Sequence, residues 1–261
     1  MSSADHERTL ILLPDGSGSA SSYANLPRIS EDTCVIAINC PFLRDPQKMI
    51  ESNMETIMDL YLEEIRACQP KGPYRLGGWS VGGVLAYLAA QRLVQEHEVV
   101  DTLVLIDSPM PNEVDELLPR FYDHLKIHNV FGRILGPDPS ASRPMPEWLI
   151  PHFQASIKIL SEYVATNDVR PVVGVHTVCV IWAPESVIDG VNIPKLGYRS
   201  TDTEGMKFLV ERRVDFSPGS WAKLFPGAEL HSRKIEGANH FSMMVSIPPF
   251  TPSVGFSANS I

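Results

Sequence analysis

A glycine–serine pattern in the first third of the chain has the spacing of a turn that carries a catalytic serine. Gly78-x-Ser80-x-Gly82 follows an apolar run and precedes an alanine-rich helical pattern at residues 84–90. In a nucleophile elbow, a strand turns sharply into a helix and holds a serine in a strained conformation at its tip. The turn presses the positions two before and two after the serine together, so both must be small. A plain glycine-rich turn would give the same short pattern, but the context favours a nucleophilic Ser80.

A serine hydroxyl becomes an effective nucleophile when a base takes its proton and a third group orients the base. His240 stands in a Gly-Ala-Asn-His loop just after the last plausible strand, which makes it the best placed of the eight histidines. His231 is the competing base, but it lies before or within that strand and is expected to point elsewhere.

The orienting acid is predicted to be Asp107, which directly follows a buried apolar run. Its carboxylate is therefore expected at the same edge of the sheet as Ser80. Glu185, after the next strand, is a rival acid, and Asp189 is a weaker one. The chain order of serine, aspartate and histidine is that of α/β-hydrolases.

Acyl transfer also needs two backbone donors aimed at the oxygen that becomes negative. The N–H group of Val81, directly after the serine, is one candidate. The loop that begins at Pro14 is expected to supply the other, with Gly16 as first choice and Ser17 as second. This loop has neither a P-loop lysine nor the three-glycine dinucleotide fingerprint, and no His or Cys pair has ligand spacing, so we expect no cofactor and no metal.

Short apolar runs alternate with helical patterns and predict the elements that position these residues. Helical spacing extends from about 50 to 67, and the elbow helix runs to about 96. The order predicts an α/β fold with a mostly parallel, doubly wound sheet, which binds ligands beyond the carboxyl ends of its strands. The predicted strands are 9–13, 33–38, the elbow strand after Pro73, 102–106, 173–183 with its apolar centre at 178–182, and 229–235.

Residues 110–172 lack strand-like runs and contain helical ones, at 114–125 and 148–164, separated by Gly and Pro. We interpret them as a helical lid inserted into the sheet domain and as a plausible wall for an acyl-binding chamber, although most of its apolar residues are expected to pack on one another. The predicted division is therefore 1–109 and 173–247 for the core, 110–172 for the lid and 248–261 for a loose, proline-interrupted tail.

The composition of the 261-residue chain excludes some classes of binding partner. The formal net charge is −9 with no basic run, which argues against nucleic acid. No signal peptide is recognisable and no apolar run is long enough to span a membrane. The cysteines show no disulfide or metal pattern, so we expect buried free thiols in a reducing, cytoplasmic setting. They are Cys34, Cys40, Cys68 and Cys179.

Four ordered motifs together give the chain a family resemblance from about Leu10 to Met244. They are the segments 13–20, 77–83, 105–109 and 237–244. The chain resembles a thioesterase domain, and above all the thioesterase or Claisen-cyclase domain of fungal non-reducing polyketide synthases. One departure is that the family continues into a helix after the last motif, whereas three prolines interrupt residues 245–252 here.

The resemblance implies an enzyme that takes a polyketide from the phosphopantetheine thiol of an acyl carrier protein onto the elbow serine. The acyl group then passes to water, a hydroxyl or a carbon nucleophile of the same chain. The family places its acid directly after the strand that follows the elbow helix, which favours Asp107 over Glu185. The alternatives are a hydrolytic editing thioesterase, a small-ester esterase, or a non-catalytic module that binds acyl groups or carrier proteins.

Overall fold

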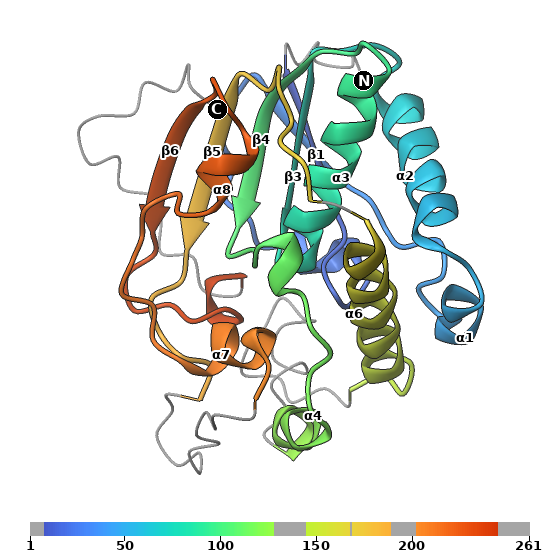
Figure 1. Ribbon diagram of the computed structural model, residues 1–261, viewed down its shortest axis with the longest axis vertical. Helices are drawn as coiled ribbons and strands as arrows, with labels where there is room; N and C mark the ends of the chain where they lie inside the picture. Colours follow the sequence, from blue (N-terminus) through green and yellow to red (C-terminus); the bar gives the residue numbers. More distant parts are fainter. Residues whose placement is uncertain (1–7, 128–144, 168, 189–201, 245–261) are drawn as a thin grey trace.

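The computed structural model describes residues 8–127, 145–167, 169–188 and 202–244 (Figure 1). Within them the chain forms a six-stranded, fully parallel sheet with the order β2-β1-β3-β4-β5-β6. All six predicted strands are present, and the predicted α/β class is confirmed. The strands are β1 (Arg8–Leu13), β2 (Thr33–Ala37), β3 (Tyr74–Trp79), β4 (Val100–Ile106), β5 (Thr177–Trp182) and β6 (Glu229–Lys234).

The central strands are apolar because they lie in the core of the molecule. β3 and β4 are buried at nearly every position, whereas the edge strand β6 has the polar sequence ELHSRK and no buried residue. Continuous apolar runs are typical of buried parallel strands, and polar side chains protect an exposed edge. β5 begins at Thr177 rather than at the predicted Val173, whose side chain is exposed.

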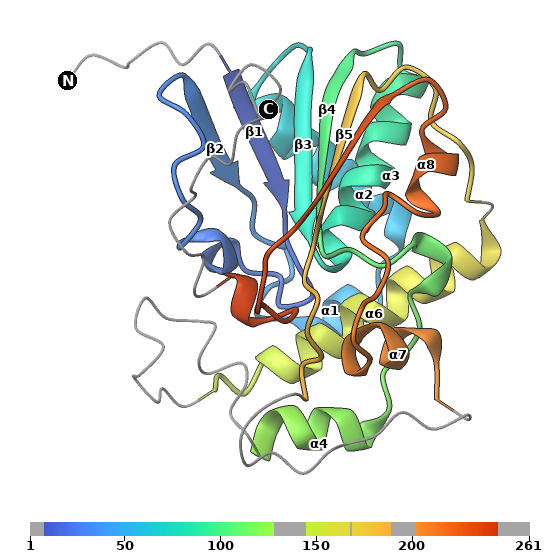
Figure 2. The same cartoon turned by 90° about the vertical axis from the view of Figure 1, so that its left-hand side faces the viewer.

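The helices fall into two groups (Figures 1 and 2). α2, α3 and α8 pack on one face of the sheet, whereas α1, α4, α6 and α7 lie beyond the carboxyl ends of the strands. The second group therefore lies around the edge at which parallel sheets bind ligands. The helices are α1 (Pro46–Ile50), α2 (Met54–Cys68), α3 (Val81–Gln95), α4 (Pro119–Ile127), α6 (Leu149–Thr166), α7 (Glu204–Val210) and α8 (Trp221–Leu224).

Two predicted helices have different bounds in the structure. The helix expected at 50–67 is divided: α1 ends at Ile50, and Asn53 caps α2 by accepting a hydrogen bond from the N–H of Thr56 at 2.8 Å. The helix expected at 114–125 begins only at Pro119, as a proline fits the first turn of a helix.

Between β4 and β5 the described residues contain helices only, namely the 3₁₀ turn η2 (Pro111–Glu113), α4 and α6. The domain boundaries at 110 and 172 stay a prediction, and the predicted tail at 248–261 lies outside the described residues. All four cysteines are free, but only Cys40 and Cys179 are buried; the prediction of burial is wrong for Cys34, which is partly exposed, and for Cys68, which is exposed.

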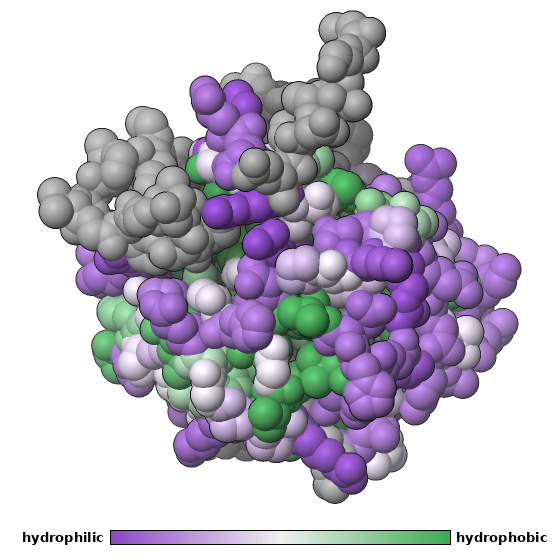
Figure 3. All heavy atoms as spheres, turned by 90° about the horizontal axis from the view of Figure 1, so that it is seen from above, coloured by the Kyte–Doolittle hydropathy of each residue, from purple (hydrophilic) through white to green (hydrophobic). Residues whose placement is uncertain are grey.

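The end of the molecule opposite α4, α6 and α7 shows mostly hydrophilic side chains with a few hydrophobic ones between them (Figure 3). It is the end at which the strands begin, as Figure 1 shows. In the part of the chain that the structure describes, no helix has the length and apolar character needed to cross a membrane.

Candidate active site

The turn between β3 and α3 has the geometry that its glycines predict. Ser80 has φ 59° and ψ −130°, a conformation that costs a non-glycine residue about 1–3 kcal/mol. A Cβ atom on Gly78 would lie 2.2 Å from the carbonyl carbon of Gly82, so a side chain at this position would force the turn open. The N–H of Ser80 donates to the carbonyl of Ile106 at 2.9 Å, which fixes the turn against β4.

The three predicted triad residues meet at the carboxyl ends of their strands. His240 Nε2 lies 3.0 Å from Ser80 Oγ, and His240 Nδ1 lies 2.7 Å from Asp107 Oδ2. Because a carboxylate only accepts, Nδ1 carries the ring proton, and Nε2 accepts the proton of the serine hydroxyl. The side chains come from the ends of β3 and β4 and from the loop after β6, and the residues are only 8% (Ser80), 2% (Asp107) and 4% (His240) exposed.

Asp107 is held firmly at the end of β4. Its backbone has φ 41°, and its N–H donates to the carbonyl of Ile181 in β5 at 2.7 Å. The carboxylate oxygen Oδ1, which faces away from the imidazole, accepts the N–H of Ala183 at 3.1 Å and lies 3.5 Å from Arg213 Nη2. Both oxygens of the acid are therefore engaged, one by His240 and the other by the residues around β5.

The rival residues lie elsewhere. The carboxylate of Glu185 forms an ion pair with the exposed Arg212 at 2.7 Å, whereas the carboxylate that contacts the imidazole of His240 is that of Asp107. His231 lies in β6, opposite Cys179, with its Nε2 3.1 Å from Glu229. Asp189 lies outside the described residues. The structure therefore places Asp107, rather than Glu185, at the imidazole.

The two sequence candidates for the second oxyanion donor differ in what they already bind. The N–H of Ser17 donates to Asp15 Oδ2 at 3.2 Å. The N–H groups of Gly16 and Val81 have no acceptor among the described residues, and Val81 opens α3, where a helix has unpaired N–H groups. The geometry therefore favours Gly16 over Ser17 as the partner of Val81.

Asp15 organises the loop around Gly16 from inside the protein. Its Oδ1 accepts the hydroxyls of Ser17 at 2.7 Å and Ser22 at 3.0 Å. Burial raises the pKa of Asp15, while these hydrogen bonds, those from Ser17 first, act in the opposite direction. Ser17 is thus bound to Asp15 through both its N–H and its hydroxyl.

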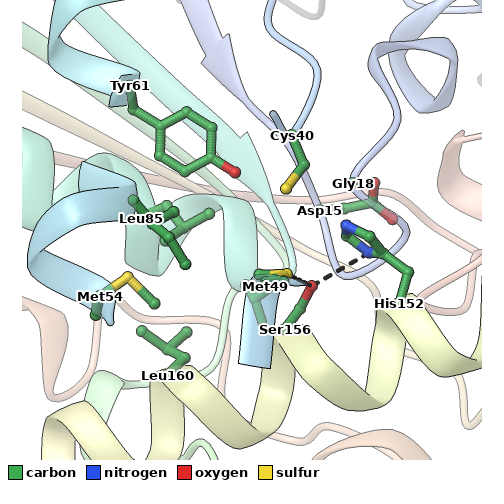
Figure 4. A pocket seen from close by; sticks show the side chains of 12 residues that line it. Asp15, Gly18, Cys40, Met49, Met54, Tyr61, Leu85, His152, Ser156 and Leu160 are labelled. Carbon is green, nitrogen blue, oxygen red and sulfur yellow. Dashed lines mark hydrogen bonds between the residues drawn. The ribbon is translucent and has the colours of Figure 1, made fainter. Parts of the chain in front are cut away.

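α6 holds the same loop from outside. The Nδ1 atom of the fully buried His152 is 3.2 Å from the carbonyl oxygen of Gly16 and 3.3 Å from Ser156 Oγ (Figure 4). A carbonyl can only accept, so Nδ1 carries the proton; burial lowers the pKa of this histidine. A Cβ on Gly16 would lie 2.5 Å from the ring of Phe153, which explains the glycine.

A tyrosine that the sequence did not single out connects the two segments that carry the candidate oxyanion donors. The hydroxyl of Tyr23 donates to the carbonyl of Leu13 at 2.6 Å and accepts the N–H of Trp79 at 2.9 Å. These two backbone groups lie at the ends of β1 and β3, just beyond the last paired residues Leu13 and Gly78. Tyr23 is 56 residues from Trp79 and stands in a serine-rich turn, so no local pattern marks it.

Aromatic rings cover the imidazole of His240. Trp79, Phe241 and Phe208 have ring centroids 5.1, 5.2 and 5.8 Å from it. Such cover excludes water and strengthens the hydrogen bonds of the triad.

Behind the loop, the cavity in Figure 4 has a volume of only about 10 Å³, roughly that of one water molecule. A larger hollow of about 290 Å³ lies between α1, α4 and α6, and Ser80 lines neither of them. Among the described residues, no group of three or more His, Cys, Asp or Glu side chains is placed to hold a metal ion.

Comparison with known sequences identifies a protein family and several relatives of this chain. Residues 8–167 match the thioesterase domain family. The chain is 47% identical over 240 residues to the non-reducing polyketide synthase CTB1 of Cercospora beticola and 38% identical over 242 residues to the norsolorinic acid synthase stcA of Emericella nidulans. These alignments cover 90% and 91% of this chain, which spans only about a tenth of either relative: 11% and 10%.

Solved structures share the fold at low sequence identity. The NocB thioesterase domain from the nocardicin cluster superimposes with a TM-score of 0.54 at 21% identity, covering 91% of this chain and 86% of that one. The RedJ thioesterase of Streptomyces coelicolor gives 0.58 at 14% identity, covering 93% and 89%. With the parallel sheet and the elbow at its centre, this confirms the α/β-hydrolase fold, and the chain belongs to the thioesterase domain family.

Proposed function

We propose that this chain releases a polyketide acyl group from an acyl carrier protein by way of an acyl-serine intermediate. The observation that carries the proposal is the continuous hydrogen-bonded path from Ser80 through His240 to Asp107, at 3.0 and 2.7 Å. Polyketide substrates are favoured because relatives such as CTB1 of Cercospora beticola and VdtA of Byssochlamys spectabilis are named non-reducing polyketide synthases.

The first half-reaction uses each part of the site. His240 Nε2 takes the proton of Ser80 Oγ as the oxygen attacks the thioester carbonyl, and Asp107 stabilises the imidazolium that forms. The N–H groups of Val81 and Gly16 bind the negative oxygen of the tetrahedral intermediate. The C–S bond then breaks, and the imidazolium returns its proton to the leaving thiolate of the phosphopantetheine arm.

In the second half-reaction, water, a hydroxyl or a carbon nucleophile of the same chain attacks the acyl-Ser80 ester. His240 takes the proton of the nucleophile and returns a proton to Ser80 Oγ as the ester bond breaks. Water gives a free acid, a hydroxyl gives a lactone and a carbon nucleophile gives a Claisen-type ring, so the product reveals which nucleophile the site admits.

The test combines labelling with turnover. A fluorophosphonate should add to Ser80 of the parent protein, as seen by mass spectrometry, and should not add to Ser80→Ala. A folded Ser80→Ala variant should release no acyl group from a carrier-protein thioester above the uncatalysed rate. Release at the parent rate would refute the proposal, and a parent protein that neither labels nor turns over would instead indicate a non-catalytic binding module.

A further inference from the structure

The proposed mechanism leaves one partly buried cation unexplained. Arg213, in the segment after α7, lies 3.5 Å from Asp107 Oδ1, the oxygen that His240 does not use. Its side chain is 21% exposed and that of Asp107 is 3% exposed, so little water separates the two charges. Ion pairs in such surroundings are screened far less than those on the surface.

The protein fixes this guanidinium in place. The guanidinium carbon lies 4.1 Å from the ring centroid of Trp182 and 4.7 Å from that of Phe208, whose ring in turn meets His240 edge-on. The backbone N–H of Arg213 donates to the carbonyl of Pro184 at 3.1 Å. A planar cation stacked on aromatic rings keeps its orientation, which a flexible lysine would not.

Burial lowers the pKa of Arg213, and Asp107 is the largest of the charges that oppose this. The other charged groups acting on the guanidinium are Glu113 in η2 and Asp215 two residues further along the chain. On the far side of the site, Asp15 interacts electrostatically with His240. Arginine stays protonated in proteins, so a fixed positive charge faces the acid of the triad.

We infer that Arg213 is a positioning residue that acts on the reaction through Asp107. This inference rests on the proposed function. The guanidinium favours the ionised carboxylate and fixes its rotation, so that Oδ2 meets the imidazole. It also weakens the attraction between the carboxylate and the protonated imidazole. Both effects depend on the positive charge beside Asp107, so a variant that lacks this charge should show an altered pH dependence of activity.

The neighbouring arginine provides a matched control. Arg212 lies one position earlier but pairs with Glu185 at the surface, with its side chain 66% exposed. Arg213→Met keeps much of the length and apolar packing of the side chain and removes its charge. Arg213→Lys keeps the charge, and Arg212→Met removes an equal charge that does not contact the triad.

The experiment measures kcat and KM of the intact chain on the octanoyl thioester of N-acetylcysteamine from about pH 5 to pH 9. For Arg213→Met we expect the acid limb of kcat/KM to move upward by about half a pH unit or more and kcat to fall about tenfold, with KM unchanged. Arg213→Lys should restore the acid limb, and Arg212→Met should match the parent. An acid limb that stays in place in Arg213→Met overturns the inference, even if kcat falls.

Two further measurements keep the inference separate from the proposed function. An NMR titration of the ring-labelled His240 needs no turnover, so it tests the role of Arg213 even if no thioester is cleaved. Its midpoint should move upward in Arg213→Met, and an unmoved midpoint refutes the inference. If Arg213→Met does not fold, Arg213→Gln replaces it: an acid limb that shifts with Gln and not with Lys supports the inference, and any other pattern overturns it.

Discussion

On one side of Ser80 an acid, a base and an arginine meet, whereas on the other side hydrogen bonds and missing side chains shape a backbone loop. We call the set Asp107, His240 and Arg213 the acid–base side, and the loop at residues 14–19 with Tyr23 and His152 the oxyanion side. On the acid–base side, the carboxylate of Asp107 lies 2.7 Å from the imidazole of His240 and 3.5 Å from the guanidinium of Arg213. On the oxyanion side, a tyrosine hydroxyl, a histidine with a lowered pKa and a glycine hold the backbone.

The difference follows from what each side must do in the proposed mechanism. The acid–base side moves a proton, so it needs groups whose charge is set by their neighbours. The oxyanion side must present fixed N–H dipoles to a charge that exists only briefly, so it needs a backbone that does not move. We therefore expect the acid–base side to be sensitive to charge and pH, and the oxyanion side to be sensitive to volume.

The largest effect should come from neutralising the acid. Asp107→Asn keeps the shape of the side chain but presents an amide to His240, which favours the wrong tautomer, so kcat should fall on the order of 10⁴-fold. Steady-state turnover of an acyl thioester measures this. The matched control is Glu185→Gln, which removes a carboxylate paired with Arg212 and should leave turnover nearly unchanged. Equal losses in the two variants would mean that the acid has been misassigned.

A methyl group on the oxyanion side should be the next most costly change. In Gly16→Ala the new Cβ would collide with the ring of Phe153 at 2.5 Å and displace the loop, so kcat should fall by about 10²–10³-fold with little change in KM. Adding Phe153→Leu should make room and recover part of the loss. A double variant no better than Gly16→Ala would show that volume is not the cause.

Removing one hydroxyl should have a smaller effect. Tyr23→Phe leaves the carbonyl of Leu13 and the N–H of Trp79 without their partner, each at a cost of about 1–3 kcal/mol in stability. We expect a lower Tm and a kcat reduced about tenfold, because both ends of the oxyanion site relax. Tyr61→Phe is the control, since that buried hydroxyl interacts with Cys40 instead. Turnover that falls equally in both variants would argue against a specific role for Tyr23.

The smallest effect should be that of His152 on the pH dependence of the free energy of unfolding. The pKa of His152 is lower in the folded protein than its ordinary value of 6.5, so the folded state binds fewer protons than the unfolded chain. The contribution of His152 to stability is therefore complete above about pH 6.5 and declines as the pH falls toward the folded value. Between about pH 7.5 and 5.5 the parent should lose on the order of 1 kcal/mol more than His152→Gln in urea unfolding.

Asp15 acts in the opposite direction, because burial raises its pKa, but it is common to both proteins and cancels in the comparison. Identical pH dependence of the free energy of unfolding in the parent and in His152→Gln would show that the histidine is not buried in its neutral form.

Much of the acid–base side could be predicted because each residue follows a strand that the sequence reveals. Asp107 stands directly after a continuous apolar run, and Ser80 stands between glycines that only a tight turn explains. Glu185 also follows a strand, so the residues alone left it as a rival to Asp107, and the family resemblance strengthened the choice of Asp107. Arg213 has no such signal, because it reaches Asp107 from a segment without strand or glycine patterns.

The oxyanion side contains contacts that local sequence patterns cannot predict. The sequence ranks Gly16 before Ser17 as the loop donor but cannot show what each N–H binds, whereas in the structure the N–H of Ser17 already donates to Asp15. Tyr23 and His152 act on backbone groups 56 and 136 residues away. No periodicity records such a contact, since it depends on how two separate elements pack.

The sequence by itself determined the parallel sheet, the position of the elbow and the order of serine, acid and base, because apolar runs and small residues act through neighbours along the chain. Only the tertiary structure decided which oxygen of Asp107 meets His240, which loop N–H is unpaired and which side chains support them. These contacts join residues that are distant in the chain, and their geometry follows from packing and burial rather than from any local preference of the backbone.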